Sequence, residues 1–299
     1  MYIENKVIKN YISIWLLLMF FIVSIIIVVG GLTRLTDSGL SITEWQLFSG
    51  IFPPLNKDQW NIYFDLYKKI PEYKLQNYSM SLNEFKVIFW WEFIHRFLGR
   101  LVGIAFFLPL VFFSFKIGFK KLLNLYIIFF LICLQGLVGW YMVSSGLVDR
   151  IDVSHFRLSL HLLIAFLILA LIFWNYLKLK NLSYSEQKFN PIIPIFFLML
   201  IFCQIVLGAF VSGLDAGKIY NSWPLMGSTY FPDDSSFYNL FKLDVFSDPS
   251  MVQFLHRNLA YLIFIFYLVI LFITYKNNLF FFFNTVKVMG FLLFLQIIL

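Results

Sequence analysis

Residues 85–115 read FKVIFWWEFIHRFLGRLVGIAFFLPLVFFSF, and this stretch decides the kind of fold. Its charged side chains and its histidine all lie in the first half, and the second half is almost entirely apolar. A helix needs roughly 20 mostly apolar residues to cross a hydrocarbon core of about 30 Å. The stretch therefore predicts a membrane-spanning helix that carries ionisable groups toward one end.

Similar apolar runs recur along the whole chain. Of the 299 residues, 61% are hydrophobic and only 13% are charged, a balance that excludes a water-soluble fold. The sequence predicts an all-α polytopic membrane protein. We expect seven spanning helices, near residues 11–29, 85–115, 122–143, 158–177, 191–211, 252–275 and 279–299.

The charge pattern predicts how the chain crosses the membrane. The net charge of +7 does not indicate a nucleic-acid partner, because the lysines gather in short segments beside alternate ends of the apolar runs. By the positive-inside rule that side, with the N-terminus, is cytoplasmic, and the long loops 32–84 and 214–250 face outward. The lysines concerned are Lys6, Lys9, Lys116, Lys120, Lys121, Lys178, Lys180, Lys188, Lys276 and Lys287.

The sequence contains an internal repeat. Residues 30–45 align without a gap on residues 208–223, with Asp37 on Asp215, and EFIHRFLGRLVG aligns on QFLHRNLAYLIF farther along. We therefore predict two pseudo-symmetric four-helix bundle units, at 1–180 and 190–299. Projecting His161 forward by the offset between His95 and His256 falls beyond Leu299, so the eighth helix is expected to be missing from this sequence.

Three histidines are candidate metal ligands. His95, His161 and His256 lie in apolar runs, near the ends that we expect to face outward, where an ionisable group is costly and usually functional. Two histidines on different helices of one bundle can supply both axial ligands of a haem iron, and His95 with His161 fits that description. The alternative is that each is a core histidine hydrogen-bonded to a neighbour.

Glu92 precedes His95 by one helical turn, so both residues share a helix face. A carboxylate there could serve as a catalytic acid or base. At the repeat-equivalent position stands Gln253, which cannot titrate, so we expect the first unit to be reactive and the second to hold a passive cofactor. Alternatively, Glu92 pairs with an arginine such as Arg96 or Arg100.

Arginines flank the ends of the helices that are expected to face outward. A guanidinium there could bind a haem propionate in bidentate fashion, or it could anchor its helix at the lipid headgroups. The candidates are Arg34, Arg96, Arg100, Arg157 and Arg257.

Taken together, the motifs resemble the haem A synthase family. They are GGLTRLTDSGLS, WEFIHRFLGRLVG, LQGLVGWYMVSSGL, RLSLHLLIAF, QIVLGAFVSGLDAGKIYNSWPLM and VQFLHRNLAY, in the family's order and over nearly the whole chain. Because the outward loops contain no cysteine, the chain is similar to the proteobacterial and mitochondrial branch.

The resemblance implies a multi-pass protein of the cell inner membrane that oxidises the C8 methyl group of haem O to a formyl group, giving haem A for cytochrome oxidase. It implies that His95 and His161 ligate the substrate haem O, that Glu92 is the acidic residue required for oxidation, and that His256 ligates haem b. Haem O synthase and an electron acceptor are the implied partners besides membrane lipid, and a homo-oligomer is left open.

Three other functions stay open at this point. A bis-histidine b-type cytochrome would need the histidines but not Glu92, and an inactive truncated synthase would keep the fold without the reaction. A transporter is a third alternative, because transporters are also built from repeats. Four crossings separate equivalent positions, which makes the two units parallel, and no run is visibly broken at its midpoint.

Overall fold

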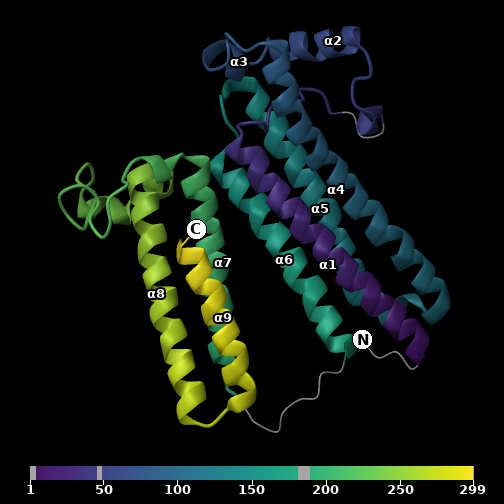
Figure 1. Ribbon diagram of the computed structural model, residues 1–299, viewed down its shortest axis with the longest axis vertical. Helices are drawn as coiled ribbons and strands as arrows, with labels where there is room; N and C mark the ends of the chain where they lie inside the picture. Colours follow the sequence, from purple (N-terminus) through teal and green to yellow (C-terminus); the bar gives the residue numbers. More distant parts are fainter. Residues whose placement is uncertain (1–4, 46–48, 181–188, 299) are drawn as a thin grey trace. The chain divides into compact units, whose positions relative to one another are not determined.

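The computed structural model describes residues 5–45, 49–180 and 189–298 (Figure 1). The chain divides into two compact units, residues 1–182 and 183–299, each of which is described here by itself. Within the described residues, seven helices are long and apolar enough to cross a membrane, which confirms the predicted fold class. Lys188 and Leu299, which entered the predictions above, lie outside the described residues.

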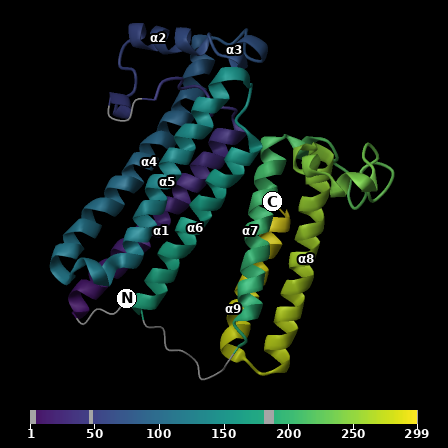
Figure 2. The same ribbon diagram turned by 180° about the vertical axis from the view of Figure 1, so that it is seen from behind.

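Four long helices build the first unit. They are α1 (Lys6–Leu35), α4 (Leu82–Ile117), α5 (Leu123–Asp149) and α6 (His155–Lys180), and the short 3₁₀ helix η2 (Phe119–Leu122) joins α4 to α5. Helix α1 packs against both α4 and α6, and α5 packs against α6 (Figures 1 and 2). Each helix begins and ends within a few residues of its predicted bounds, and the largest differences are at the C-terminal ends of α1 and α5, which continue to Leu35 and Asp149.

Apolar side chains from all four helices fill the centre of this bundle. Ile12, Leu16, Phe106, Leu125 and Ile172 are fully buried there. Because lipid is as apolar as these side chains, close packing and polar contacts between helices hold such a bundle together. One such contact joins α1 to α4, where the indole nitrogen of Trp15 donates to the Ala105 carbonyl at 3.0 Å.

The loop expected at 32–84 contains two helices that the apolar runs did not reveal. After the 3₁₀ turn η1 (Ser49–Ile51) come α2 (Lys57–Tyr67) and α3 (Pro71–Leu75). Asn56 caps α2, and Ser81 with Glu84 forms a capping box that begins α4. We call this segment the outer cap, residues 36–81. Its buried aromatic residues pack against the first turns of α4.

The second unit contains three long helices, α7 (Ile192–Gly213), α8 (Pro249–Lys276) and α9 (Phe280–Ile298). Helix α8 packs against both α7 and α9. Three 3₁₀ turns lie between α7 and α8, namely η3 (Ala216–Lys218), η4 (Phe237–Phe241) and η5 (Leu243–Ser247). Asp248 caps α8 by accepting from the backbone amides of Ser250 and Met251.

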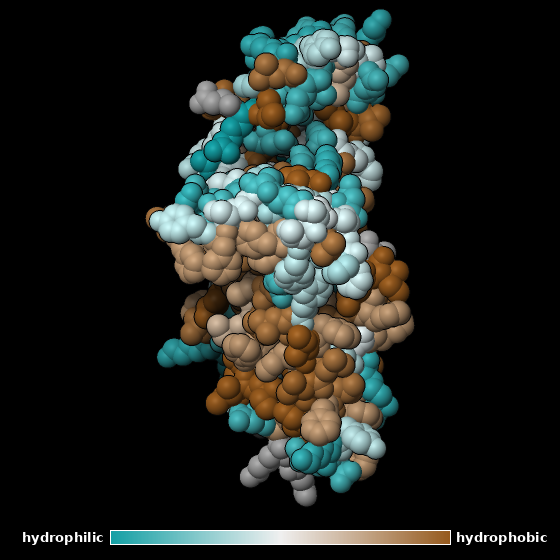
Figure 3. Space-filling model, turned by 90° about the vertical axis from the view of Figure 1, so that its left-hand side faces the viewer, coloured by the Kyte–Doolittle hydropathy of each residue, from teal (hydrophilic) through white to brown (hydrophobic). Residues whose placement is uncertain are grey.

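Apolar side chains cover the outside of the long helices. Figure 3 shows hydrophobic residues gathered over one face of the molecule, with hydrophilic residues above and below them. On α8 the exposed apolar residues include Leu262, Ile265, Leu268 and Phe272. A soluble protein rarely exposes so continuous an apolar surface, whereas hydrocarbon lipid covers one at no cost.

The two copies of the aligned motif end their helices in the same way. Helix α1 ends at Leu35 and α7 ends at Gly213, and the second residue after each end adopts a left-handed backbone conformation. These residues are Asp37, with φ of 48°, and Asp215, with φ of 51°. Non-glycine residues seldom adopt this conformation, although aspartate tolerates it better than most. The repeated motif therefore has one backbone shape in both units.

Candidate functional site

His95 and His161 face each other inside the first unit. His95 lies on α4 and His161 on α6, and their ring centroids are 6.5 Å apart with the planes inclined by 64°. His161 is two helical turns from the start of α6, and His95 lies at a matching level because α4 begins farther out, beneath the outer cap. The structure thus brings together two residues that lie on either side of the whole of helix α5 in the sequence.

The spacing of the two rings suits a metal ion held between them. Histidine nitrogens bind zinc at about 2.0–2.1 Å, and with a similar bond to iron two imidazoles in line would place their centroids roughly 6 Å apart. In both rings the Nδ1 atom is buried and has no hydrogen-bond partner among the described residues. The Nδ1 edge of each ring lies toward a neighbouring helix, so Nε2 is the nitrogen that would bind a metal held between the two rings.

The donor set also indicates what kind of metal group could fit. Among the described residues, no three histidine, cysteine, aspartate or glutamate side chains cluster closely enough to hold a bare metal ion. Two imidazoles alone complete the coordination of a metal whose other ligands come from a macrocycle. A haem fits this pair of histidines for that reason.

His256 occupies the corresponding place in the second unit. It lies two turns into α8, its Nδ1 atom is buried without a partner among the described residues, and its Nε2 atom lies 3.2 Å from the side-chain nitrogen of Gln204 on α7. The described part of this unit brings no second histidine to it. His256 can therefore supply one axial ligand from these residues.

Glu92 is buried and fully engaged by the protein. One carboxylate oxygen accepts from the Ser41 hydroxyl and the Ile42 backbone amide, both at 2.7 Å. The other accepts from the Arg96 guanidinium at 2.6 and 2.9 Å. Of the two alternatives that the sequence left open, the structure contains the ion pair between Glu92 and Arg96. The carboxylate thereby ties the outer cap to α4.

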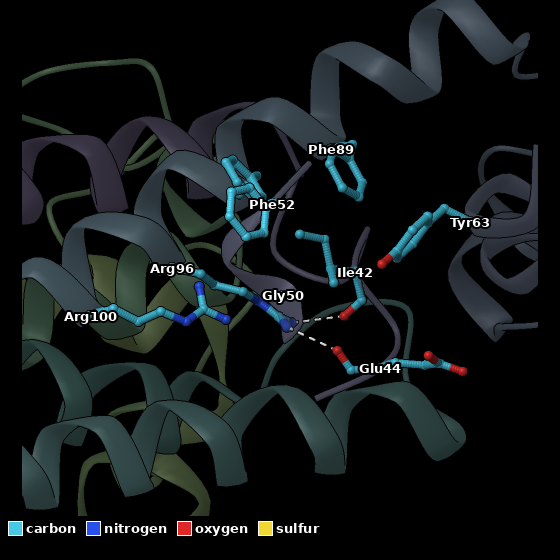
Figure 4. A pocket seen from close by; sticks show the side chains of 9 residues that line it. Ile42, Glu44, Gly50, Phe52, Tyr63, Phe89, Arg96 and Arg100 are labelled. Atoms are coloured by element: carbon cyan, nitrogen blue, oxygen red, sulfur yellow. Dashed lines mark hydrogen bonds between the residues drawn. The ribbon is translucent and has the colours of Figure 1, made fainter. Parts of the chain in front are cut away.

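Arg96 extends the same connection along the outer cap. Besides Glu92, its guanidinium donates to the carbonyl oxygens of Ile42 at 2.8 Å and Glu44 at 3.3 Å (Figure 4). Arg96 and Arg100 both line a hollow between α4 and the cap, together with Tyr63 and aromatic residues of α4. Both guanidinium groups lie at this hollow, so either could meet an anionic group that enters it.

In the second unit an arginine also joins a helix to the preceding loop, but a glutamine takes the place of the carboxylate. Arg257 on α8 donates to the carbonyl oxygens of Tyr220 at 2.7 Å and Ser222 at 2.9 Å, which are the repeat equivalents of Ile42 and Glu44. Gln253, the equivalent of Glu92, donates to the Tyr220 carbonyl at 2.9 Å instead of pairing with the arginine. An arginine that clasps two loop carbonyls is therefore common to both units, and only the first adds a carboxylate.

The remaining two arginines hold neighbouring segments together. Arg34, at the end of α1, pairs with Asp37 at 2.7 Å and with Asp152 at 3.5 Å. Arg157 on α6 donates to the Ser145 hydroxyl on α5. It also lies over the Tyr141 ring, 4.7 Å from its centroid. These contacts fix the ends of α1, α5 and α6 around the histidine pair.

The comparisons with known proteins identify the family of the chain. The sequence profile of the cytochrome oxidase assembly protein family matches residues 13–299. The chain belongs to that family. No solved structure shows a significant match to the chain.

Curated relatives in the family carry one name. The heme A synthase of Pelagibacter ubique is 52% identical over 93% of this chain and 83% of its own length. Those of Parvibaculum lavamentivorans and Rickettsia bellii are 47% and 46% identical, each over 83% of this chain and over 73% and 75% of their own lengths. The family resemblance predicted from the motifs is confirmed.

Sequence reasoning missed several residues around the site. Ser41 and Ile42 hold Glu92, and a signal for them was available, because they lie inside the aligned motif that ends at Trp45. Glu72 was also missed. It lies in the outer cap and is, besides Glu92 on α4, a second buried carboxyl group. No pattern in the sequence marks it, since it lies in a polar segment that reads as exposed loop.

Proposed function

We propose that this chain is a haem A synthase, a membrane oxidoreductase that converts the C8 methyl group of haem O to a formyl group and so provides haem A for cytochrome oxidase. The single observation that carries the proposal is the facing pair His95 and His161 in a chain of this family. The names of the curated relatives support it.

In this proposal the first unit takes the substrate and the second keeps a resident cofactor. His95 and His161 would hold haem O, and His256 would hold haem b. A bound haem supplies a redox-active iron through which electrons can leave the methyl group toward an electron acceptor. The protein would position the porphyrin between the helices. Water would supply the oxygen atom of the formyl group, and four electrons and four protons would leave over the two oxidation steps.

Glu92 could act in two ways, by positioning the outer cap and by accepting a proton. Its contacts with Ser41, Ile42 and Arg96 support a positioning role, because they hold the outer cap over the end of the histidine pair. Each two-electron oxidation of the methyl carbon also releases protons, and a carboxylate one turn from His95 could accept one of them. The equivalent Gln253 cannot do so, which supports a reaction confined to the first unit.

The arginines are assigned by the segments that they contact. Arg96 and Arg257 hydrogen-bond to loop carbonyl oxygens, and Arg34 and Arg157 bind groups at the ends of helices. We therefore assign these four arginines a structural role around the haem sites. Arg100, which lines the hollow beneath the cap, is the candidate for a propionate of the substrate.

The same proposal covers location and partners. We place the protein in the cell inner membrane, with a cytoplasmic N-terminus and with the histidines toward the periplasmic side. Haem O synthase would deliver the substrate, and an electron acceptor would take the electrons. The seven apolar helices and the bacterial relatives support a multi-pass membrane protein.

The test is haem analysis in a bacterial host that makes haem O but lacks its own haem A synthase. Expression of this chain should produce haem A in extracted membranes, and His95→Ala should abolish it. Glu92→Gln should retain haem binding and lose most conversion, with Gln253→Glu as the matched control that keeps activity. Haem bound without any haem A would overturn the synthase proposal in favour of a b-type cytochrome or an inactive synthase.

A further inference from the structure

Each ring of the facing histidine pair lies directly on a glycine of a neighbouring helix. A Cβ atom added to Gly30 of α1 would lie 2.9 Å from Cε1 and 3.3 Å from Nδ1 of His95. One added to Gly139 of α5 would lie 2.9 Å from Cε1 and 3.5 Å from Nδ1 of His161. Real Cβ atoms do not approach other atoms this closely, so any other residue would displace the ring.

The second unit repeats the contact. A Cβ atom on Gly208 of α7 would lie 3.2 Å from Cε1 of His256. Gly208 aligns with Gly30 and His256 aligns with His95, so the same pair of positions makes the same contact in both copies of the repeat. A chance packing detail would not be expected at both.

The contact is with the imidazole and not with a helix backbone. At Gly30 and at Gly139 the three nearest heavy atoms are all atoms of the histidine ring. Ordinary helix packing through small residues brings backbones together, and it does not account for this pattern. Neighbouring glycines on the same two helices differ, because Gly31 and Gly136 have nothing within 4 Å of an added Cβ.

Because the glycine has no side chain, the histidine ring can adopt the orientation that it has in this structure. An imidazole turns about two side-chain torsions, so an added methyl group would move the ring more readily than it would move a helix. In metal sites, groups around a histidine set its orientation, and losing them typically costs roughly 10–100-fold in metal affinity or activity.

We propose that three glycines are positioning residues that set the planes of the axial histidines, an inference that rests on the haem sites of the proposed function. The pairs are Gly30 with His95, Gly139 with His161, and Gly208 with His256. Each glycine offers its ring a bare stretch of helix to lie against, and a side chain at that position would push the ring out of this orientation.

The experiment compares alanine variants on the same helices. Gly30→Ala and Gly31→Ala are made in full chains that also carry His256→Ala, so that only the first unit binds haem. The detergent-solubilised, haem-depleted proteins are titrated with hemin, and the ferric low-spin signal is recorded by electron paramagnetic resonance. Gly30→Ala should weaken hemin binding by about tenfold and shift the low-spin g values, while Gly31→Ala leaves both unchanged.

A second pair of variants repeats the comparison on another helix, and a third substitution at a less crowded glycine serves if Gly30→Ala does not fold. Gly139→Ala and Gly136→Ala repeat the comparison on α5, and Gly208→Ala, without the His256→Ala change, tests the less crowded site if Gly30→Ala fails to fold. Equal spectra and affinities for the ring-contacting and non-contacting variants would overturn the inference alone. Absence of a low-spin hemin complex in the His256→Ala protein with all its glycines would instead overturn the proposed histidine pair.

Discussion

Replacing Glu72 by glutamine should remove a pH dependence from the stability of the outer cap. Glu72 lies on α3, is only 3% exposed, and accepts from the Tyr67 hydroxyl at 3.1 Å and from the Asn77 amide at 3.4 Å through one oxygen. Its other oxygen is buried with no partner among the described residues. Burial, reinforced by the negative charge of Glu92, raises the pKa of Glu72 to about 8 from an ordinary 4.5.

The size and sign of the effect follow from that shift. One pKa unit corresponds to about 1.4 kcal/mol, so the difference between the folded and unfolded cap amounts to roughly 5 kcal/mol at most. The folded cap keeps the proton between pH 4.5 and about 8, whereas the unfolded cap releases it. Stability is therefore complete below pH 4.5 and is lost as the pH rises through about 8.

Hydrogen exchange measures this directly. Amide protection in α2 and α3, corrected for the intrinsic exchange rate, should fall in the wild type between pH 4.5 and about 8 and level off above that pH. Glu72→Gln stays neutral with similar shape, so its protection should be nearly independent of pH. The control is Asp65→Asn, an exposed change on α2 that should keep the wild-type slope.

One result would refute the reasoning. If Glu72→Gln lost protection with pH as steeply as the wild type, the carboxyl group would not be the group that titrates. Protection in the wild type that rose with pH would contradict the sign, because it would mean that the folded cap favours the ionised form.

Substitutions at three further positions test the packing of the second unit by thermal unfolding in detergent. Arg257→Lys should cost about 1–3 kcal/mol, because an ammonium cannot reproduce the fork that holds two carbonyls of the 214–248 loop, and an unchanged midpoint would contradict the clasp. Gly290→Ala should cost roughly 1–3 kcal/mol, since the added Cβ would fall 1.9 Å from the Tyr267 hydroxyl oxygen. Asp215→Val should cost about 1–2 kcal/mol at its left-handed backbone position while Asp215→Gly should not, and equal midpoints would refute that account.

The sequence alone determined the spanning helices and the family. Backbone groups inside a membrane must be paired within the segment, so a run of about 20 apolar residues has essentially one structure available to it. The aligned motifs also predicted that Asp37 and Asp215 are equivalent, and both adopt the same uncommon backbone conformation. These features depend on local composition or on direct comparison of two stretches of the chain.

Only the tertiary structure decided how the polar groups are partnered. Helices α2 and α3 are short and amphipathic, so no apolar run marked them, and the burial of Glu72 depends on the aromatic residues that close over it. The sequence left Glu92 open between a catalytic carboxylate and an ion pair, and the fold supplied both Arg96 and the Ser41–Ile42 loop. Contacts such as Gly30 with His95 join residues far apart in the chain, and such contacts follow from the packing of whole helices rather than from any local pattern.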